Sequence, residues 1–117
     1  MKNTSQIERI ERRMGQPGLL QDSKRRLRRT FGKRLVGVVL YGSRARGKER
    51  PGSDVDLLVL LKGKIAVDRD LRACIRALSP LSEKTGLYLS ARPTSAARYQ
   101  ENAYPLYWNV RREGVPL

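Results

Sequence analysis

The sequence LVGVVLYGSRARGKERPGSDVDLLVLL, residues 35–61, holds two apolar runs separated by a polar segment. Residues 35–41 and 54–61 have the length and the apolar, partly β-branched composition of buried strands. Residues 42–52 are basic and punctuated by glycines, which predicts a loop with room for one helical turn. Two buried strands joined in this way predict a small sheet.

Helices are predicted on both sides of this pair of strands. Ser5 and Glu8 have the spacing of a capping box, and the helix that they open should stop at Gly15. A second helix is predicted over residues 19–30. Downstream of the strands, Leu71, Cys74 and Leu78 have helical spacing, and they predict a helix over residues 67–81.

The remainder of the chain predicts a third strand and two short helices. The strand should span residues 86–90 and be closed by Pro93, and the last helix should end within residues 111–114. The order of elements predicts an α/β (α+β) fold, in which a small mixed sheet of about three strands is flanked by helices. Residues 1–117 are expected to form a single domain, with basic helices over 1–32 and the core over 33–117.

Composition narrows the chemistry of the chain. It has 25 Lys and Arg against 11 Asp and Glu, a net charge of +14, which attracts nucleotides, nucleic acid or an acidic protein. It has no histidine, so catalysis would depend on carboxylates, hydroxyls, Lys or Arg, with hard cations as cofactors. The single cysteine, Cys74, excludes an intrachain disulfide and favours a core position and a cytoplasmic location. No apolar run is long enough to predict a membrane span.

The first candidate binding residues follow the first strand. Gly42 has no Cβ, so a ligand could approach the backbone there, and Ser43 offers a hydroxyl and an N–H to phosphate oxygens. The nearby cations can neutralise a polyphosphate, and they are Arg44, Arg46 and Lys48. The spacing of Gly42, Gly47 and Lys48 imitates a P-loop, but Pro51 would break the helix that a P-loop opens.

The second candidate site residues are Asp54 and Asp56, which open the second strand two positions apart. Their side chains should leave the same face of the sheet, where two carboxylates repel unless a cation lies between them. Mg²⁺ or Mn²⁺ suits such a pair, because Mg²⁺ accepts a few carboxylates and completes its octahedron with water and phosphate oxygens. Asp54 and Asp56 are therefore the predicted metal ligands and catalytic residues.

The motifs Gly-Ser-Arg-Ala-Arg-Gly and Ser-Asp-Val-Asp-Leu, placed between and within two buried strands, resemble those of the DNA polymerase-β-like nucleotidyltransferases. The ending PLYWNVRREGVPL, residues 105–117, is also similar to the final helix of the smallest members, the minimal nucleotidyltransferases. The resemblance implies that Gly42 and Ser43 hold the triphosphate of an NTP, with ATP expected. It also implies that Asp54 and Asp56 bind the Mg²⁺ that activates the α-phosphate.

Members of this family usually place a third carboxylate on the next strand. This chain has no Asp or Glu between Lys84 and Gln100, and Glu83 and Glu101 lie outside the predicted strand. Three functions remain open at this stage. One is a transferase that moves NMP onto a hydroxyl, at a low rate because the third carboxylate is missing. Another is an antitoxin-like partner of a HEPN toxin with little or no catalysis, a pairing that the resemblance implies. The third is a basic RNA-binding module.

Two further features have weaker implications. The run Lys24–Arg29 could bind nucleic acid or an acidic protein, or could be a solvated helix face. Tyr104, Tyr107 and Trp108 could stack on a base, although core or interface positions are expected at this spacing.

Overall fold

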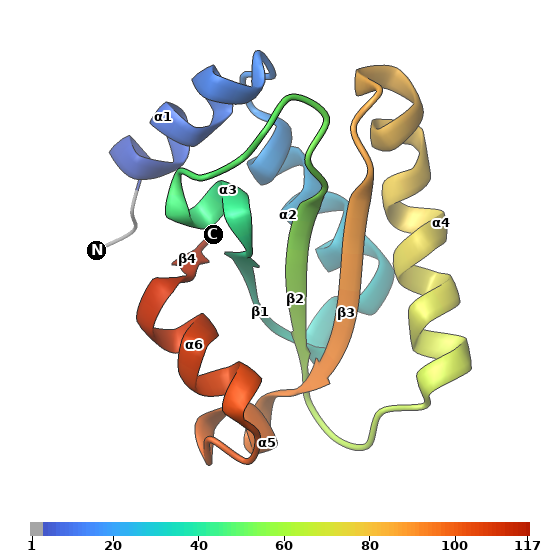
Figure 1. Ribbon diagram of the computed structural model, residues 1–117. Helices are drawn as coiled ribbons and strands as arrows, with labels where there is room; N and C mark the ends of the chain where they lie inside the picture. Colours follow the sequence, from blue (N-terminus) through green and yellow to red (C-terminus); the bar gives the residue numbers. More distant parts are fainter. Residues whose placement is uncertain (1–3) are drawn as a thin grey trace.

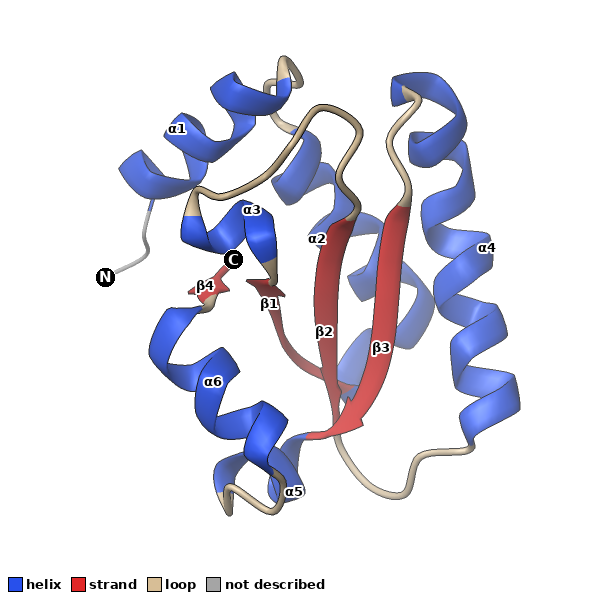
Figure 2. Cartoon of the chain, viewed as in Figure 1, coloured by secondary structure: helices blue, strands red, loops and turns tan. Residues whose placement is uncertain are grey.

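The computed structural model describes residues 4–117 (Figures 1 and 2). The elements, in chain order, are α1 (Thr4–Met14), α2 (Leu19–Phe31), a 3₁₀ turn η1 (Gly32–Arg34), β1 (Leu35–Tyr41), α3 (Ser43–Arg46), β2 (Val55–Leu61), α4 (Val67–Thr85), β3 (Leu89–Ser95), α5 (Ala96–Gln100), α6 (Pro105–Glu113) and β4 (Val115–Pro116).

The sheet has the order β3-β2-β1-β4 and mixes two kinds of pairing. Strand β1 is antiparallel to β2 and to β4, whereas β2 is parallel to β3 through the crossover helix α4. The mixed sheet flanked by helices confirms the predicted fold class, with four strands in place of about three.

Alternate residues of the central strands face two separate cores. Leu57, Val59 and Leu61 of β2 belong to the larger core, which α1, α2 and α4 close from one side of the sheet. Leu58 and Leu60 face the smaller core, to which α5 and α6 contribute Ala96 and Val110. In Figure 1, α5 and α6 lie over the lower left of the sheet, and the upper ends of β2 and β3 stand clear of them. The smaller core therefore covers only part of its face.

Strand β3 was predicted in the wrong place. It spans Leu89–Ser95 rather than residues 86–90, and Pro93 lies inside it rather than closing it. Pairing with β2 fixes the position of β3. Pro93 is tolerated inside the strand because β3 lies at the edge of the sheet, where a residue without an N–H can face outward. The Val55 N–H donates to the carbonyl of Tyr88, so in a parallel ladder Leu89, Ala91 and Pro93 turn their backbone groups outward.

Strand β4 and the length of α4 were also missed. Val115 and Pro116 pair with Leu40 and Val39 of β1, a contact too short and too distant in sequence to show as a pattern. Helix α4 runs to Thr85, four residues past the predicted end, and Gly86 at φ +74° ends it. Pro80 lies inside α4 on its exposed side, where water can bond the Arg76 carbonyl that a proline leaves without its helical N–H.

Two expectations about individual apolar residues had different outcomes. Cys74 is fully buried, as predicted, and burial raises the pKa of its thiol to about 12. Leu71, predicted on the same buried face, is 37% exposed, and Asp70 takes the buried position beside Cys74 instead.

Asp70 links α4 to η1, the turn before β1, through a partly buried ion pair with Arg34. Its carboxylate is 1% exposed and accepts hydrogen bonds from both terminal nitrogens of Arg34, at 3.0 and 3.1 Å, and from the N–H of Ala66 at 3.0 Å. The Arg34 hydrogen bonds lower the pKa of Asp70, against the effect of burial. The carboxylate also closes the first turn of α4, where a negative charge is favoured.

We expect Asp70→Asn to destabilise the fold by about 2–3 kcal/mol, because it leaves a guanidinium without its charged partner. Asp22→Asn is the matched control, since Asp22 pairs with Arg25 on the surface and should cost under about 1 kcal/mol. Urea unfolding measures both changes. Because the folded pKa of Asp70 is depressed, its contribution is present above the ordinary aspartate pKa and is lost as pH falls through the folded value. An Asp70→Asn loss that persists unchanged into strong acid would contradict this assignment.

Among residues 4–117, no helix is long and apolar enough to cross a membrane.

Candidate functional site

The candidate site forms where β1 ends and β2 begins. The antiparallel register pairs Tyr41 with Asp56, so the turn that follows β1 lies beside the first residues of β2. Helix α3 starts at Ser43, which confirms the helical turn expected in this segment. The Gly-Ser and Asp-x-Asp motifs, separated by more than ten residues in sequence, thus occupy one corner of the sheet.

Gly42 and the carboxylate of Asp56 are in direct steric contact. Gly42 has φ +77°, and a Cβ built on it would overlap Oδ2 of Asp56 and lie 3.2 Å from its Cγ. Only glycine provides both this backbone conformation and this space. The requirement for glycine therefore comes at least partly from Asp56, a reason that the sequence alone did not indicate.

The two aspartates differ in their surroundings. Asp54 is exposed just before β2, and Asp56 is half-buried as the second residue of the strand. Burial is the main cause that raises the pKa of Asp56, the negative charge of Asp54 raises it further, and the positive charge of Arg46 lowers it. The charge of Asp54 thus acts on Asp56, and a cation between the two carboxylates would be favoured.

Arg44 makes contacts within the protein. Its side chain is only 4% exposed, and Nε and one terminal nitrogen donate to the carbonyl of Ser53, at 3.0 and 2.9 Å. Ser53 immediately precedes Asp54, so this fork fixes the segment that presents the aspartate pair. The structure thus gives Arg44 a positioning contact that the sequence did not reveal.

The other two predicted phosphate-binding cations are exposed. Arg46 lies at the end of α3, 3.6 Å from Glu113 of α6, and Lys48 follows in the loop. A cavity of about 250 Å³ adjoins this point, with Tyr41, Gly42 and Arg46 on one side. Its other lining residues come from α6, and they are Leu106, Asn109, Val110 and Glu113. Sequence reasoning missed this contribution of α6, because no local pattern brings the helix to the Gly-Ser turn.

Strand β3 places Ser90 next to Asp56. The parallel register pairs the two residues directly, and β3 contains no Asp or Glu. Glu83 and Glu101 are exposed, in α4 and after α5. Within residues 4–117, no three side chains of His, Cys, Asp or Glu gather into a metal-binding group. Along β2 and β3 the corner therefore offers two carboxylates and a serine, while Glu113 of α6 lies across the small cavity and pairs with Arg46.

The run Lys24–Arg29 is partly occupied by contacts within the protein. Lys24 Nζ donates to the carbonyl of Leu117 and Arg26 Nε to that of Ala77, both at 2.6 Å. Arg25 pairs with Asp22. Arg28 and Arg29 are exposed on α2, which packs on the opposite face of the sheet from the candidate site.

Comparison with known proteins is consistent with this geometry. Residues 20–100 match the family model described as the nucleotidyltransferase domain. A crystal structure from Sulfolobus solfataricus, described as that of a nucleotidyltransferase, superposes with a TM-score of 0.59. The two sequences are 20% identical, and the superposition covers 98% of this chain and 87% of the other. No curated protein matches the chain significantly.

Proposed function

Because the chain belongs to the nucleotidyltransferase domain family, we propose that it binds an NTP, with ATP expected, together with Mg²⁺ and transfers NMP to a hydroxyl acceptor. The observation that carries this proposal is the contact between Gly42 and Asp56. It sets a turn suited to phosphate directly against a carboxylate suited to metal. Phosphoryl chemistry asks a protein mainly for positioning and charge neutralisation, and both would be provided at this corner.

The proposed roles follow from burial and exposure. Ser43, with Arg46 and Lys48, contacts the phosphates, because the two cations are exposed beside the Gly42 turn. Arg44 acts mainly as a positioning residue, since its guanidinium is buried against the Ser53 carbonyl. The sequence-based prediction that Arg44 also binds phosphate stays a prediction.

The aspartate pair fits Mg²⁺ better than a transition metal. Its donors are the carboxylate oxygens of the exposed Asp54 and the half-buried Asp56, next to a turn where phosphate oxygens could complete an octahedron, and the chain has no histidine. Asp54 and Asp56 would hold the ion, and Mn²⁺ has the same preference for oxygen. When bound, the ion would supply charge neutralisation at the α-phosphate. Asp56 must be ionised to bind it, so its raised pKa predicts that binding weakens in mild acid before an ordinary aspartate would protonate.

The absence of an acid from β3 favours a second candidate function. With Ser90 beside Asp56, β3 supplies no third carboxylate that could deprotonate an acceptor hydroxyl. The chain would then bind a nucleotide and transfer it slowly, or act mainly through a partner protein. A HEPN-type partner, which the resemblance in sequence implies, remains a prediction.

We expect ATP binding to depend on Mg²⁺ through the aspartate pair. In calorimetry, Mg²⁺ should strengthen ATP binding to the wild type about 5- to 150-fold, the usual range of coupling between two ligands. Asp54→Asn combined with Asp56→Asn should remove that difference. The matched control is Glu83→Gln with Glu101→Gln, which removes the same charge from exposed positions.

The control also tests whether either glutamate completes the site. The variant with both glutamates replaced should keep the wild-type increase of ATP affinity with Mg²⁺ and the wild-type melting temperature. Equal ATP affinity with and without Mg²⁺ in the wild type would refute the proposed metal site, and absence of any ATP binding would refute the proposed function.

A further inference from the structure

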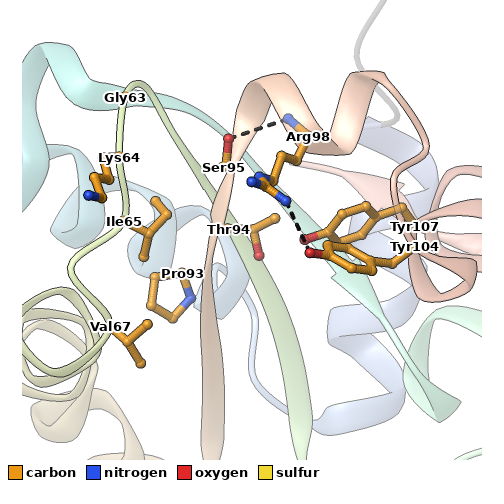
Figure 3. A pocket seen from close by; sticks show the side chains of 10 residues that line it. All are labelled: Gly63, Lys64, Ile65, Val67, Pro93, Thr94, Ser95, Arg98, Tyr104 and Tyr107. Carbon is orange, nitrogen blue, oxygen red and sulfur yellow. Dashed lines mark hydrogen bonds between the residues drawn. The ribbon is translucent and has the colours of Figure 1, made fainter.

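A cavity of about 510 Å³ lies away from Gly42, where the loop after β2 passes the end of β3. Figure 3 shows Lys64, Ile65 and Val67 on one wall, and the side chains of α5 and α6 on the opposite one. Pro93 and Thr94 of β3 lie between the two walls. A second cavity, of about 320 Å³, shares Pro93, Thr94, Tyr104 and Tyr107 with the first and adds Arg92 and Leu106. We call the two together the β3 groove.

The β3 groove leads toward the candidate site. The register pairs Asp56 with Ser90 and Leu58 with Arg92, so all four share one face of the sheet. Arg92 lies two residues from Ser90, or roughly 7 Å at 3.3 Å per residue. Its positive charge lowers the pKa of Tyr41, which burial and Asp56 raise, and Tyr41 is the β1 partner of Asp56. One end of the β3 groove thus lies within electrostatic reach of the aspartate pair.

The lining of the β3 groove is basic. Lys64, Arg92 and Arg98 contribute three positive charges, and no Asp or Glu lines either cavity. Such a surface repels cationic acceptors such as amino sugars and attracts polyanions. Because the three cations come from the loop after β2, from β3 and from α5, rather than from one point, their charge suits a chain of phosphates better than a single anion.

An aromatic side chain is held in the same place. Tyr104 is 49% exposed, and its hydroxyl accepts a hydrogen bond from Arg98 at 3.1 Å. Its ring packs edge-on against Tyr107, with centroids 5.4 Å apart. Arg98 is itself fixed to Ser95, whose hydroxyl caps α5 (Figure 3). A ring held in place beside cations is the usual platform on which an unpaired base stacks.

We infer that the β3 groove binds single-stranded nucleic acid, and that a terminal hydroxyl of this strand is the acceptor for the transfer proposed above. The acceptor role rests on that proposed function, whereas the binding role does not. In the transfer, the hydroxyl oxygen forms a bond to the α-phosphorus of the NTP. The bond from this phosphorus to the oxygen bridging to the β-phosphate breaks, pyrophosphate leaves, and the hydroxyl proton passes to water.

Fluorescence anisotropy with a short labelled single-stranded RNA tests the binding role. Arg92→Glu combined with Arg98→Glu should weaken RNA binding about tenfold or more. The slope of the logarithm of the binding constant against the logarithm of the salt concentration should fall by roughly 1.4, the value for two lost phosphate contacts on a single strand. Arg28→Glu with Arg29→Glu is the matched control on α2, with the same change in net charge, and should weaken binding only about threefold or less.

A second pair of variants tests stacking. Tyr104→Ala should weaken RNA binding about tenfold, as expected for loss of one base–aromatic contact. Trp108→Ala removes an aromatic side chain that is exposed on α6 but outside both cavities, and it should leave affinity unchanged. Single-stranded DNA should compete with RNA, because stacking and phosphate contacts do not need the 2′-hydroxyl.

Three results would overturn the binding inference. The first is an equal loss of RNA affinity in the β3-groove and α2 double variants. The second is duplex RNA that binds as tightly as the single strand. The third is polyglutamate that competes as effectively as RNA, which would indicate that the ligand of the groove is an acidic protein. Magnesium–ATP calorimetry on Tyr104→Ala separates the two proposals, because this variant changes no charge near Asp56, lies outside the cavity beside Gly42 and should keep ATP affinity. If the wild type binds RNA but no ATP, the proposed function and the acceptor role fail, and the binding role stands. If it binds both but transfers no labelled AMP to the RNA, the acceptor role fails alone.

Discussion

Gly42→Ala should abolish measurable Mg²⁺–ATP binding, a loss of about 100-fold or more. The new methyl group would overlap Oδ2 of Asp56, in a backbone conformation that alanine rarely adopts. Asp56 must then turn away, or the turn before Ser43 must shift, and either movement separates the proposed metal ligand from the proposed phosphate-binding turn. Loss of one or two hydrogen bonds to a charged phosphate, each contributing roughly 1.5–3 kcal/mol, is enough for an effect of this size.

Gly52→Ala is the matched control for this substitution. Gly52 lies in the same loop with φ +82°, but a Cβ there would meet nothing within 4 Å. The control therefore carries the backbone strain without the overlap, and it should bind Mg²⁺–ATP as the wild type does. Calorimetry gives the affinities and thermal melting shows that both variants fold. A folded Gly42→Ala protein with normal affinity would remove Asp56 from the proposed site.

Ser90→Asp should accelerate nucleotidyl transfer about 100-fold or more, within the range of general-base assistance. Ser90 is the residue that β3 places beside Asp56, so an aspartate there would complete the set of three carboxylates implied by the resemblance to polymerase-β-like enzymes. The sequence left Tyr88 and Ser90 as alternatives. The register selects Ser90, because Tyr88 precedes the strand and is 59% exposed.

The measurement is incorporation of labelled AMP into single-stranded RNA, with Ser90→Asn as a control of similar size and no charge. Ser90→Asn should transfer no faster than the wild type. The added carboxylate should also make the melting temperature more dependent on Mg²⁺, since three acids in one corner repel without a cation. A wild type that already transfers rapidly would show that the corner needs no third acid. Equal rates for the two variants would show that Ser90 is not its position.

The sequence predicted the centre of the fold well, for reasons that are local. Strands β1 and β2 are apolar runs that can only be buried, and the Gly-Ser and Asp-x-Asp motifs mark their adjoining ends. Helix α2 ends at Phe31, one residue past its predicted end, with Gly32 as its C-cap. Each of these features is decided within about ten residues of sequence.

The errors concern contacts between distant segments. The position of β3 depends on its register with β2, and β4 exists only because two residues pair with β1. At the candidate site, neither the packing of Gly42 against Asp56 nor the fork from Arg44 to Ser53 has a local signature. The same holds for the wall that α6 adds beside Gly42. Those contacts decide the proposed roles. Sequence alone could therefore propose the site residues, but it could not distinguish a residue that binds the metal or phosphate from one that positions it.

The proline within β3 has a consequence for how copies of this protein behave in a crowded solution. β3 leaves one edge of the sheet open, beside an apolar strand, Val55–Leu61, of the kind that forms fibrils when it pairs between chains. Of the outward-facing positions, Leu89 donates its N–H to the hydroxyl of Ser82 and Pro93 has none to donate. Between these two positions the N–H of Ala91 faces outward, so a strand from another chain could not form a continuous ladder of backbone hydrogen bonds along this edge. The edge is therefore a poor template for polymerisation. Pairing between the sheet edges of two copies is disfavoured although no helix or loop of residues 4–117 covers the β3 groove beside that edge.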